Sequence, residues 1–293
     1  MESKISVLVP TRGRRSLAER FLLSAFQLSN APNSVEYILY VDDDDLDSQA
    51  ISVTGVQYRI IVGPRCNMGV CNTRCLEEAQ GDIIVLGNDD VVIRTKGWDE
   101  KIRIFHQSIP DRIYLAYPND LNKGEELSAF PILSRKTCEL ISQPFPAIYK
   151  GAFIDTHLME IFVRLKNMGD NRISYMEDVV FEHLHFRTGK VEIDQTYKDR
   201  DRFADDMIFL SLNHIRKDTA KFLSNVINNK ISDASRFNFT EPSIIKRPAS
   251  LLRMIRVLAS LYFFDRSLPL LFRIKDFLYY TVRWFFACMK RYR

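Results

Sequence analysis

Residues 66–92, CNMGVCNTRCLEEAQGDIIVLGNDDVV, indicate the fold of this 293-residue chain more clearly than any other segment. They predict a helix, a glycine turn, a buried strand over residues 82–86, and an Asn88-Asp89-Asp90 cluster directly after that strand. A strand that is apolar along most of its length is typical of a parallel sheet covered on both faces. Ligands in open α/β sheets bind beyond the carboxyl ends of such strands. The cluster therefore predicts a ligand site, although a solvated turn would also explain it.

The first half of the chain alternates between strand and helix patterns. This alternation predicts crossover connections and a Rossmann-like α/β fold with a mostly parallel central sheet. Two short strand candidates, at residues 172–175 and 179–181, lead into Glu182-His183-Leu184-His185. The other expected strands are 4–10, 36–41, 57–62, 82–86 and 113–117, and the expected helices are 16–28, 70–80, 99–107, 136–142 and 155–168.

Composition and the positions of the glycines divide the chain into three parts. Hydrophobic residues make up 46% of the sequence, which argues against a disordered protein. All glycines lie at or before Gly189, so the remainder should be largely helical. We expect an α/β domain over residues 1–227, a linker over 228–243 and amphipathic helices over 244–293. The five cysteines have no common zinc spacing and are expected to be buried, reduced thiols. No signal peptide is expected at the N-terminus.

Five short motifs follow one another in a specific order. They are Val7-Leu8-Val9-Pro10-Thr11-Arg12, Tyr40-Val41-Asp42-Asp43, Asn67-Met68-Gly69 with Arg74, Ala79-Gln80-Gly81-Asp82, and Asn88-Asp89-Asp90. Over residues 4–190 the chain resembles the GT-A-fold glycosyltransferases of the family 2 type, which include enzymes of bacterial polysaccharide and lipopolysaccharide synthesis. The resemblance implies transfer of a sugar from a nucleotide-diphosphate donor, expected to be UDP-linked, to a saccharide or lipid-linked saccharide acceptor.

The resemblance also implies a donor site across the strand ends. Asp42 would contact the base or ribose, while arginines would fork onto phosphate oxygens. Lys190 would neutralise the departing diphosphate. A solubilising acidic turn at Asp42, surface ion pairs at the arginines and an ordinary charged loop at Lys190 are the alternatives. The expected donor-binding residues are Pro10, Thr11, Arg12, Asp42, Arg74, Asp89 and Lys190.

A divalent metal, Mn²⁺ or Mg²⁺, is implied by the same resemblance. The family usually carries Asp-x-Asp at this position, whereas the first residue here is Asn88. Asp90 would therefore bind most of the metal, with Asn88 as a weaker neutral ligand. Several GT-A enzymes add a histidine after the core domain, and His185 is the expected one. Structural packing of His183 and His185 is the alternative.

Inverting members of the family deprotonate the acceptor hydroxyl with an acid at the start of a helix. Asp155 occupies this position, and Ile154 replaces the acid that usually precedes it. Asp155 is also where the N-cap of helix 155–168 is expected, and the helix terminus favours an ionised carboxylate. The resemblance thus implies inversion with Asp155 as the general base. A histidine metal ligand also occurs in retaining enzymes, so the stereochemistry stays open.

The last fifty residues combine basic and aromatic side chains. Residues 244–293 hold eleven Lys and Arg against two acids, a net charge of +9, whereas residues 1–243 carry −5 of the overall +4. No uncharged apolar run reaches the roughly 20 residues of a spanning helix. Helices of this kind lie in membrane interfaces, so we expect a peripheral position on the cytoplasmic face of the cell membrane. The expected membrane contacts are Arg253, Arg256, Arg273, Arg283, Trp284 and Lys290.

Other interpretations of the tail and of the whole chain are open. The C-terminal helices would also suit packing on the catalytic domain or an oligomer interface. Nucleic acid is not expected as a partner, because the aromatics lie within continuous aliphatic stretches. A degenerate GT-A domain, acting as a scaffold or saccharide-binding subunit, is favoured by Asn88 and Ile154. A sugar-nucleotidyltransferase would need more glycines than the one in residues 10–14.

Overall fold

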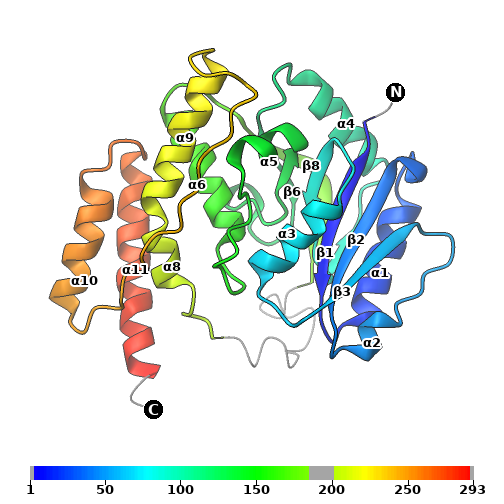
Figure 1. Cartoon of the computed structure of the whole chain (residues 1–293), viewed down its shortest axis with the longest axis horizontal. Helices are drawn as coiled ribbons and strands as arrows, with labels where there is room; N and C mark the ends of the chain where they lie inside the picture. The colour runs from blue at the N-terminus through cyan, green and yellow to red at the C-terminus, as the bar shows by residue number, and fades with distance from the viewer. Residues whose placement is uncertain (1–2, 185–200, 291–293) are drawn as a thin grey trace.

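Figure 1 shows the chain as a computed structural model, which describes residues 3–184 and 201–290, without the side chain of Lys290. Within these ranges eight strands form one sheet in the order β3-β2-β1-β4-β7-β6-β8-β5. Strands β3, β2, β1 and β4 are parallel, β7 is antiparallel to both its neighbours, β8 is parallel to β6, and β5 is antiparallel to β8. The strands are β1 (Ile5–Thr11), β2 (Val35–Asp42), β3 (Tyr58–Gly63), β4 (Ile83–Leu86), β5 (Val91–Ile93), β6 (Leu115–Asn119), β7 (Ile132–Ser134) and β8 (Ile173–His183).

Helices cover both faces of the sheet. Val7 and Val9 of β1 belong to the apolar cluster that includes α1 and α4, whereas Leu8 belongs to the cluster with α3, α5, α6 and α9. This period of two is expected for a strand buried on both faces. The helices are α1 (Arg15–Gln27), α2 (Leu46–Gln49), α3 (Met68–Glu78), α4 (Trp98–Ser108), α5 (Arg135–Ile141), α6 (Ile154–Asn167), α8 (Asp206–Ser211), α9 (Asn213–Ile227), α10 (Leu251–Leu258) and α11 (Leu270–Lys290), with short turns η1 (Pro32–Ser34), η2 (Gly124–Glu126) and the π-helical η4 (Ala259–Phe263).

The predicted fold class is confirmed, with two local differences. The strand candidates at 172–175 and 179–181 are parts of the single strand β8, whose pairing with β6 is irregular after Pro118. Strand β7, which is not among the strands expected from the sequence, inserts between β4 and β6. Its insertion separates the parallel N-terminal half of the sheet from β6, β8 and β5.

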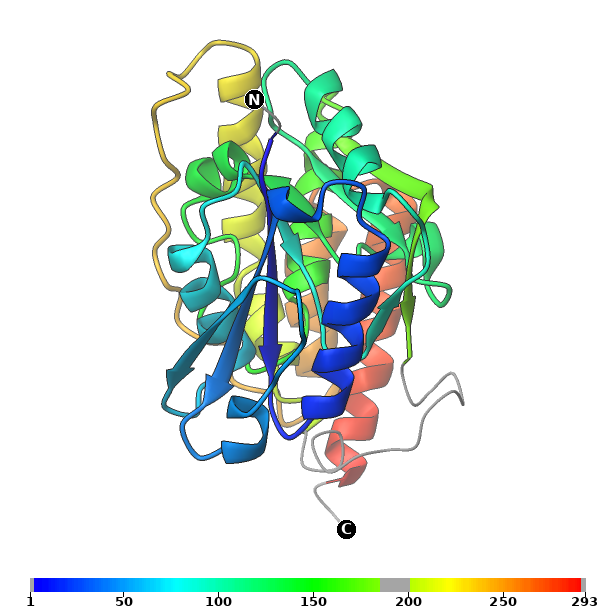
Figure 2. The same cartoon turned by 90° about the vertical axis from the view of Figure 1, so that its right-hand side faces the viewer.

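The C-terminal helices share the main apolar core. Leu258, Tyr262 and Trp284 belong to the same buried cluster as Leu8 of the central strand. Figure 1 shows α10 and α11 beside α8 and α9, and Figure 2 shows α11 behind the sheet while α1 lies in front. Residues 228–243 contain no helix or strand, yet Phe237 donates its N–H to the carbonyl of Leu140. The linker is therefore not a break between two separately packed cores.

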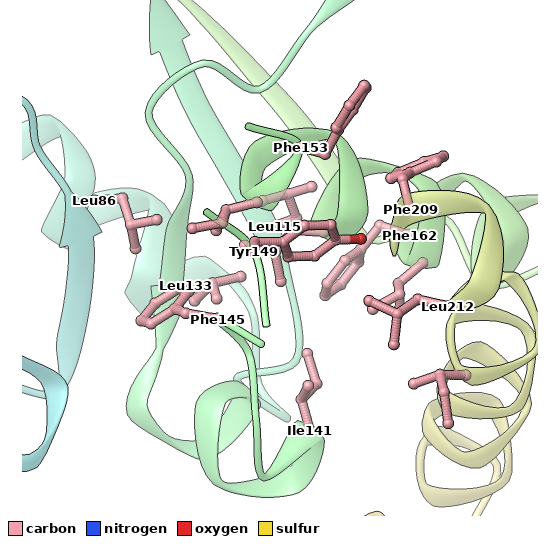
Figure 3. Packing of buried hydrophobic residues seen from close by; sticks show 14 of the residues in the cluster. Leu86, Leu115, Leu133, Ile141, Phe145, Tyr149, Phe153, Phe162, Phe209 and Leu212 are labelled. Carbon is pink, nitrogen blue, oxygen red and sulfur yellow. The ribbon is translucent and has the colours of Figure 1, made fainter. Parts of the chain in front are cut away.

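Buried charges connect α6, α9 and the turn before α11. Glu160 accepts from Arg164 Nε at 2.9 Å and lies 3.0 Å from Arg216 Nε. Arg164 also reaches Asp265, and the Arg216 guanidinium lies 3.7 Å from the ring centre of Phe209. Figure 3 shows Phe209 beside Phe153, which precedes α6. Removing one partner from such a group leaves an uncompensated buried charge, so these pairs specify how the helices dock.

Candidate active site

Three strands bring polar residues to one edge of the sheet. Thr11 of β1 pairs with Val41 of β2, and β1 is also in register with β4, so the three carboxyl ends meet. The Thr11 hydroxyl donates to Asp89 Oδ2 at 2.7 Å. Pro10 and Asp42 are buried at the ends of β1 and β2. The structure thus brings together Pro10, Thr11, Asp42 and Asp89, as the order of the motifs predicted.

The acid pair after β4 is buried and faces one arginine. Asp89 and Asp90 are 2% and 3% exposed. Arg14 Nη1 lies 3.0 Å from Asp89 Oδ1 and 3.9 Å from Asp90 Oδ2. Burial raises the pKa of Asp89 to about 6, and the neighbouring Asp90 adds to the rise while Arg14 opposes it. Two buried carboxylates with their hard oxygen atoms suit a divalent cation.

His183 lies beside this acid pair. It pairs with Val91 across β8 and β5, and the following N–H, of Leu184, donates to the carbonyl of Asp90. As a result His183 Nε2 lies 3.3 Å from Asp90 Oδ1, and its ring makes an edge contact with Phe130. The histidine placed at Asp90 is therefore His183. The expected ligand His185 and the expected donor contact Lys190 lie outside the described residues.

The remaining metal candidate, Asn88, is half-buried at the start of the cluster. Its side-chain oxygen accepts from the N–H of Asp89 at 3.2 Å. An amide that turns toward its own backbone stabilises the turn after β4. Among the residues near the acid pair, the side chains that fit as ligands of Mn²⁺ or Mg²⁺ are those of Asp90, His183 and Asp89. Asn88 lies next to them.

The acidic run after β2 holds the loop after β1. Arg12 Nη1 lies 2.7 Å from Asp42 Oδ2, and Arg12 Nη2 donates to Asp44 at 2.9 Å. Asp45 accepts from the N–H of Gly13, a glycine with φ of +61°. Arg12 therefore lies beside Asp42, the predicted base or ribose contact, and forms ion pairs with Asp42 and Asp44.

Arg74, an expected donor contact, lies in a surface ion pair. Its side chain is 60% exposed on α3 and lies 3.0 Å from Glu77, one turn along the same helix. The reason is the helix phase: α3 turns Cys71 and Cys75 toward the sheet, so Arg74 points to solvent. This is the alternative that the sequence left open.

Asp155 lies in the first turn of α6 and is not its N-cap. The cap is Phe153, in the left-handed region with φ of +68°, and it supplies no side-chain cap. Its ring instead packs 4.9 Å from that of Phe209. Asp155 accepts from the N–H of Thr156 at 2.7 Å, and its carbonyl accepts from Ser128. A carboxylate at the helix N-terminus still gains from the helix dipole.

Asp205 holds the segment that precedes α6. Its carboxylate accepts from the backbone N–H groups of Lys150, Gly151 and Ala152 at 2.9, 3.0 and 2.7 Å. Sequence patterns did not identify Asp205 or Arg14 as site residues, and they did not place His183 beside Asp90. Arg14 follows the first strand closely and His183 lies two residues before the predicted ligand His185 in the sequence, so weak signals existed for these two. For Asp205 there was none, because its partners are backbone groups.

The predicted membrane contacts point in different directions. Arg253 and Arg256 are exposed on α10, and Arg273 donates to the carbonyl of Phe263. Arg283 lies 2.6 Å from Asp206, and Trp284, 8% exposed, donates to the carbonyl of Pro248. Arg283 and Trp284 thus make internal contacts, Arg283 with the buried counter-charge of Asp206 and Trp284 with a backbone carbonyl. The side chain of Lys290 lies outside the described part of the chain.

Known proteins share this fold at low sequence identity. No protein-family model and no curated protein sequence matches the chain. PcManGT, a mannosyltransferase from Pyrobaculum calidifontis solved with GDP-Man and Mn²⁺, is similar with a TM-score of 0.50 and 12% identity, over 97% of this chain and 86% of the other. TarS residues 1–349 from S. aureus is similar with a TM-score of 0.51 and 15% identity, over 95% and 89%.

These similarities define the class of fold. The chain has the GT-A fold of the two solved proteins, with a mostly parallel sheet and C-terminal helices. The acid pair lies beyond the carboxyl end of β4, where ligands bind in open α/β sheets.

Proposed function

We propose that this protein is a metal-dependent glycosyltransferase that uses a nucleotide-diphosphate sugar, with a UDP-sugar as the expected donor. The buried Asp89–Asp90 pair, with His183 Nε2 at 3.3 Å, carries this proposal. It lies at the carboxyl edge of a GT-A sheet, and PcManGT, which shares the fold, was solved with GDP-Man and Mn²⁺. The acceptor proposed from the family resemblance is a saccharide or lipid-linked saccharide of cell-surface polysaccharide synthesis.

Asp90 and His183 would hold the metal, with Asp89 and Asn88 close by and His185 as a further predicted ligand. When bound, the metal stabilises negative charge on the diphosphate leaving group. Asp42, buried at the end of β2, accepts hydrogen bonds and suits an imide N–H or a ribose hydroxyl. Arg12 and Arg14, already beside these acids, suit the phosphates.

The proposed chemistry is direct displacement with inversion. Asp155 takes the proton of the acceptor hydroxyl, the acceptor oxygen forms a bond to the anomeric carbon, and the bond to the diphosphate oxygen breaks. The position of Asp155 in the first turn of α6 supports this role, because the positive end of the helix dipole stabilises a carboxylate there.

An apolar stripe on the C-terminal helices supports peripheral membrane binding. No helix in the described ranges is long and apolar enough to cross a membrane. On α11 the exposed apolar side chains recur every three or four residues, so they lie on one face. Exposed apolar patches of this extent mark interaction sites. The exposed residues of the stripe are Leu271, Ile274, Leu278, Val282, Phe285 and Met289.

The charge around the stripe favours an anionic leaflet over another protein surface. Arg253, Arg256 and Lys275 are exposed on α10 and α11. The two acids of residues 244–293 are turned inward: Asp265 pairs with Arg164, and burial raises the pKa of Asp276 to about 7. Each basic residue near an anionic surface contributes about 1 kcal/mol. We therefore propose the cytoplasmic face of the cell membrane as the location.

Calorimetric titration with UDP and GDP, each with and without Mn²⁺, tests the proposed function. We expect UDP binding that depends on Mn²⁺ and is lost in Asp90→Ala and weakened in His183→Ala. Asp218→Asn, on the exposed side of α9, is the matched control and should bind as the unaltered protein does. Binding of neither nucleotide would overturn the donor site and favour a degenerate GT-A scaffold.

A further inference from the structure

Two thiols lie in contact at the wall of the donor site. Cys66 and Cys71 are both free, and their Sγ atoms are 2.9 Å apart. One carboxylate oxygen of Asp42 and the two sulfur atoms all lie within 4.8 Å of one another. The pair therefore lies next to the residue proposed to contact the base or ribose of the donor.

The start of α3 explains why the sulfur atoms meet. Asn67 is the N-cap, and its side chain accepts from the N–H of Val70 at 3.0 Å. Cys66 is the residue before the cap and Cys71 is the fourth residue of the helix. These two positions pack against each other in a hydrophobic staple, and here both are cysteine.

The loop that carries Cys66 is tied on both sides. Tyr40 of β2 donates its hydroxyl to the carbonyl of Pro64 at 2.8 Å. Gly69 donates its N–H to the carbonyl of Tyr149 at 3.2 Å. Because the backbone is held in this way, the two thiols stay close without any rearrangement of the chain.

The two thiols differ in access. Cys66 is half-buried, whereas Cys71 is 6% exposed. Burial raises the pKa of the Cys71 thiol, and the nearby Cys66 and Asp42 add to the rise. A reagent from solvent therefore meets Cys66 first, and Cys71 is in place to react with whatever forms there.

We propose that Cys66 and Cys71 form a reversible thiol–disulfide site that is oxidised by a small-molecule disulfide such as oxidised glutathione. The Cys66 thiolate attacks one glutathione sulfur, forms a mixed disulfide and releases one glutathione thiolate, which takes up a proton. Cys71 then gives up its proton, attacks Cys66 Sγ and releases the second glutathione. The protein dithiol is oxidised by two electrons, and one glutathione disulfide is reduced to two thiols.

Oxidation alters the donor site. A disulfide requires the sulfur atoms to approach to about 2.05 Å, and Cys66 then shifts toward α3 beside Asp42. This consequence rests on the proposed function, whereas formation of the disulfide does not. We expect the dissociation constant for UDP with Mn²⁺ to change by about fivefold or more between the two forms.

Intact mass spectrometry of the full chain, incubated with oxidised glutathione and a chelator, tests the site. The expected product has lost two hydrogen atoms, retains no glutathione at this pair and returns to the starting mass with dithiothreitol. Cys71→Ser should instead retain glutathione on Cys66, and Cys66→Ser should form no disulfide. Cys288→Ser, whose cysteine is half-buried on α11, is the control and should behave as the unaltered chain.

The proposal would be overturned if the unaltered protein kept glutathione bound to Cys66. It would also be overturned if both thiols of the folded protein stayed reduced while those of the urea-unfolded chain reacted with oxidised glutathione. Titration of the oxidised and reduced forms with UDP and Mn²⁺ follows. Equal affinities would overturn the link to the donor site. If neither form bound UDP while the disulfide still formed, the proposed function would fail and the thiol site would stand.

Discussion

Asp205 accepts a hydrogen bond from the backbone N–H of Ala152, 2.7 Å away, three residues before Asp155. The same carboxylate holds the N–H groups of Lys150 and Gly151. Its neighbour Asp206 pairs with Arg283 of α11. The C-terminal helix is therefore connected, through adjacent residues, to the segment that sets where α6 begins and where the proposed base lies.

Asp205→Asn should lower turnover more than donor affinity. An amide has one acceptor oxygen and brings its own N–H groups toward the backbone donors, so residues 150–152 shift. A displacement of about 1 Å at a reacting group reduces the rate by up to about 100-fold. We expect kcat to fall at least tenfold, with the UDP–Mn²⁺ affinity unchanged. Steady-state kinetics beside calorimetry separates the two, and an equal loss in both would indicate general destabilisation.

Asp155→Asn should abolish most turnover with little change in folding. The amide cannot take the acceptor proton, and general-base catalysis contributes about 10²–10⁴-fold. The half-buried side chain makes local contacts to Thr156, so stability should change little. Transfer to an acceptor is measured beside UDP binding. Near-normal transfer would show that Asp155 is not the base, and the anomeric form of the product then decides between inversion and retention.

Arg14→Met should make the protein's stability depend on Mn²⁺. Without the guanidinium, the buried Asp89 and Asp90 lose the cation that faces both of them, and removing one partner from a buried charged group costs about 3–5 kcal/mol. A bound divalent cation replaces the lost charge, so Mn²⁺ should raise Tm more in this variant than in the unaltered protein. Arg74→Met, which removes an exposed pair with Glu77, is the control and should change stability by less than about 1 kcal/mol. If Mn²⁺ raised Tm equally in Arg14→Met and in the unaltered protein, the metal would not bind at Asp89 and Asp90.

Binding to lipid vesicles should require both the basic residues and the apolar stripe. Arg253→Glu with Arg256→Glu should weaken sedimentation with phosphatidylglycerol vesicles, because each reversal removes attraction to anionic headgroups. Leu278→Asp with Phe285→Asp should do the same by placing charge in the stripe. Lys221→Glu, exposed on α9, is the control. If the protein formed dimers as its concentration rose and did not bind vesicles, the stripe would be an interface between copies of the chain.

Asp276 should make the folded state less stable as pH rises from about 4 to about 7. Burial, with Glu160 nearby, raises its pKa from 3.8 to about 7. Between these values the folded protein binds a proton that the unfolded chain has released, so stability is lost as pH increases. Asp276→Asn removes this dependence and should gain about 3 kcal/mol relative to the unaltered protein between pH 4.5 and pH 7.5.

Urea unfolding at those two pH values measures the difference. Asp218→Asn on exposed α9 is the control and should leave the pH dependence unchanged. A parallel pH dependence in Asp276→Asn and the unaltered protein would show that Asp276 is ionised in the folded state. Glu160 and Arg216 lie near this group, so both must be kept in the variant.

Patterns local in the sequence predicted the parts of the fold that depend on local structure. The alternation of strands and helices in the first half predicted the parallel sheet, and the positions of Asp42 and Asp89 after their strands predicted the edge at which they meet. The absence of glycine after Gly189 agrees with the helices α8, α9, α10 and α11 of the described residues. Arg283 was expected at the membrane surface, because nothing in its neighbourhood in the sequence indicates its partner Asp206.

The sequence by itself determined the alternation of strands and helices in the N-terminal half, the class of fold and the edge where the acids lie, since periodicity and strand-end residues are local properties. Only the tertiary structure decided that His183 adjoins Asp90, that Arg14 faces the acid pair, and that Arg283 turns inward to Asp206. Each of these depends on a partner distant in the sequence. A charged side chain faces inward where a buried counter-charge meets it, and no local pattern contains that information.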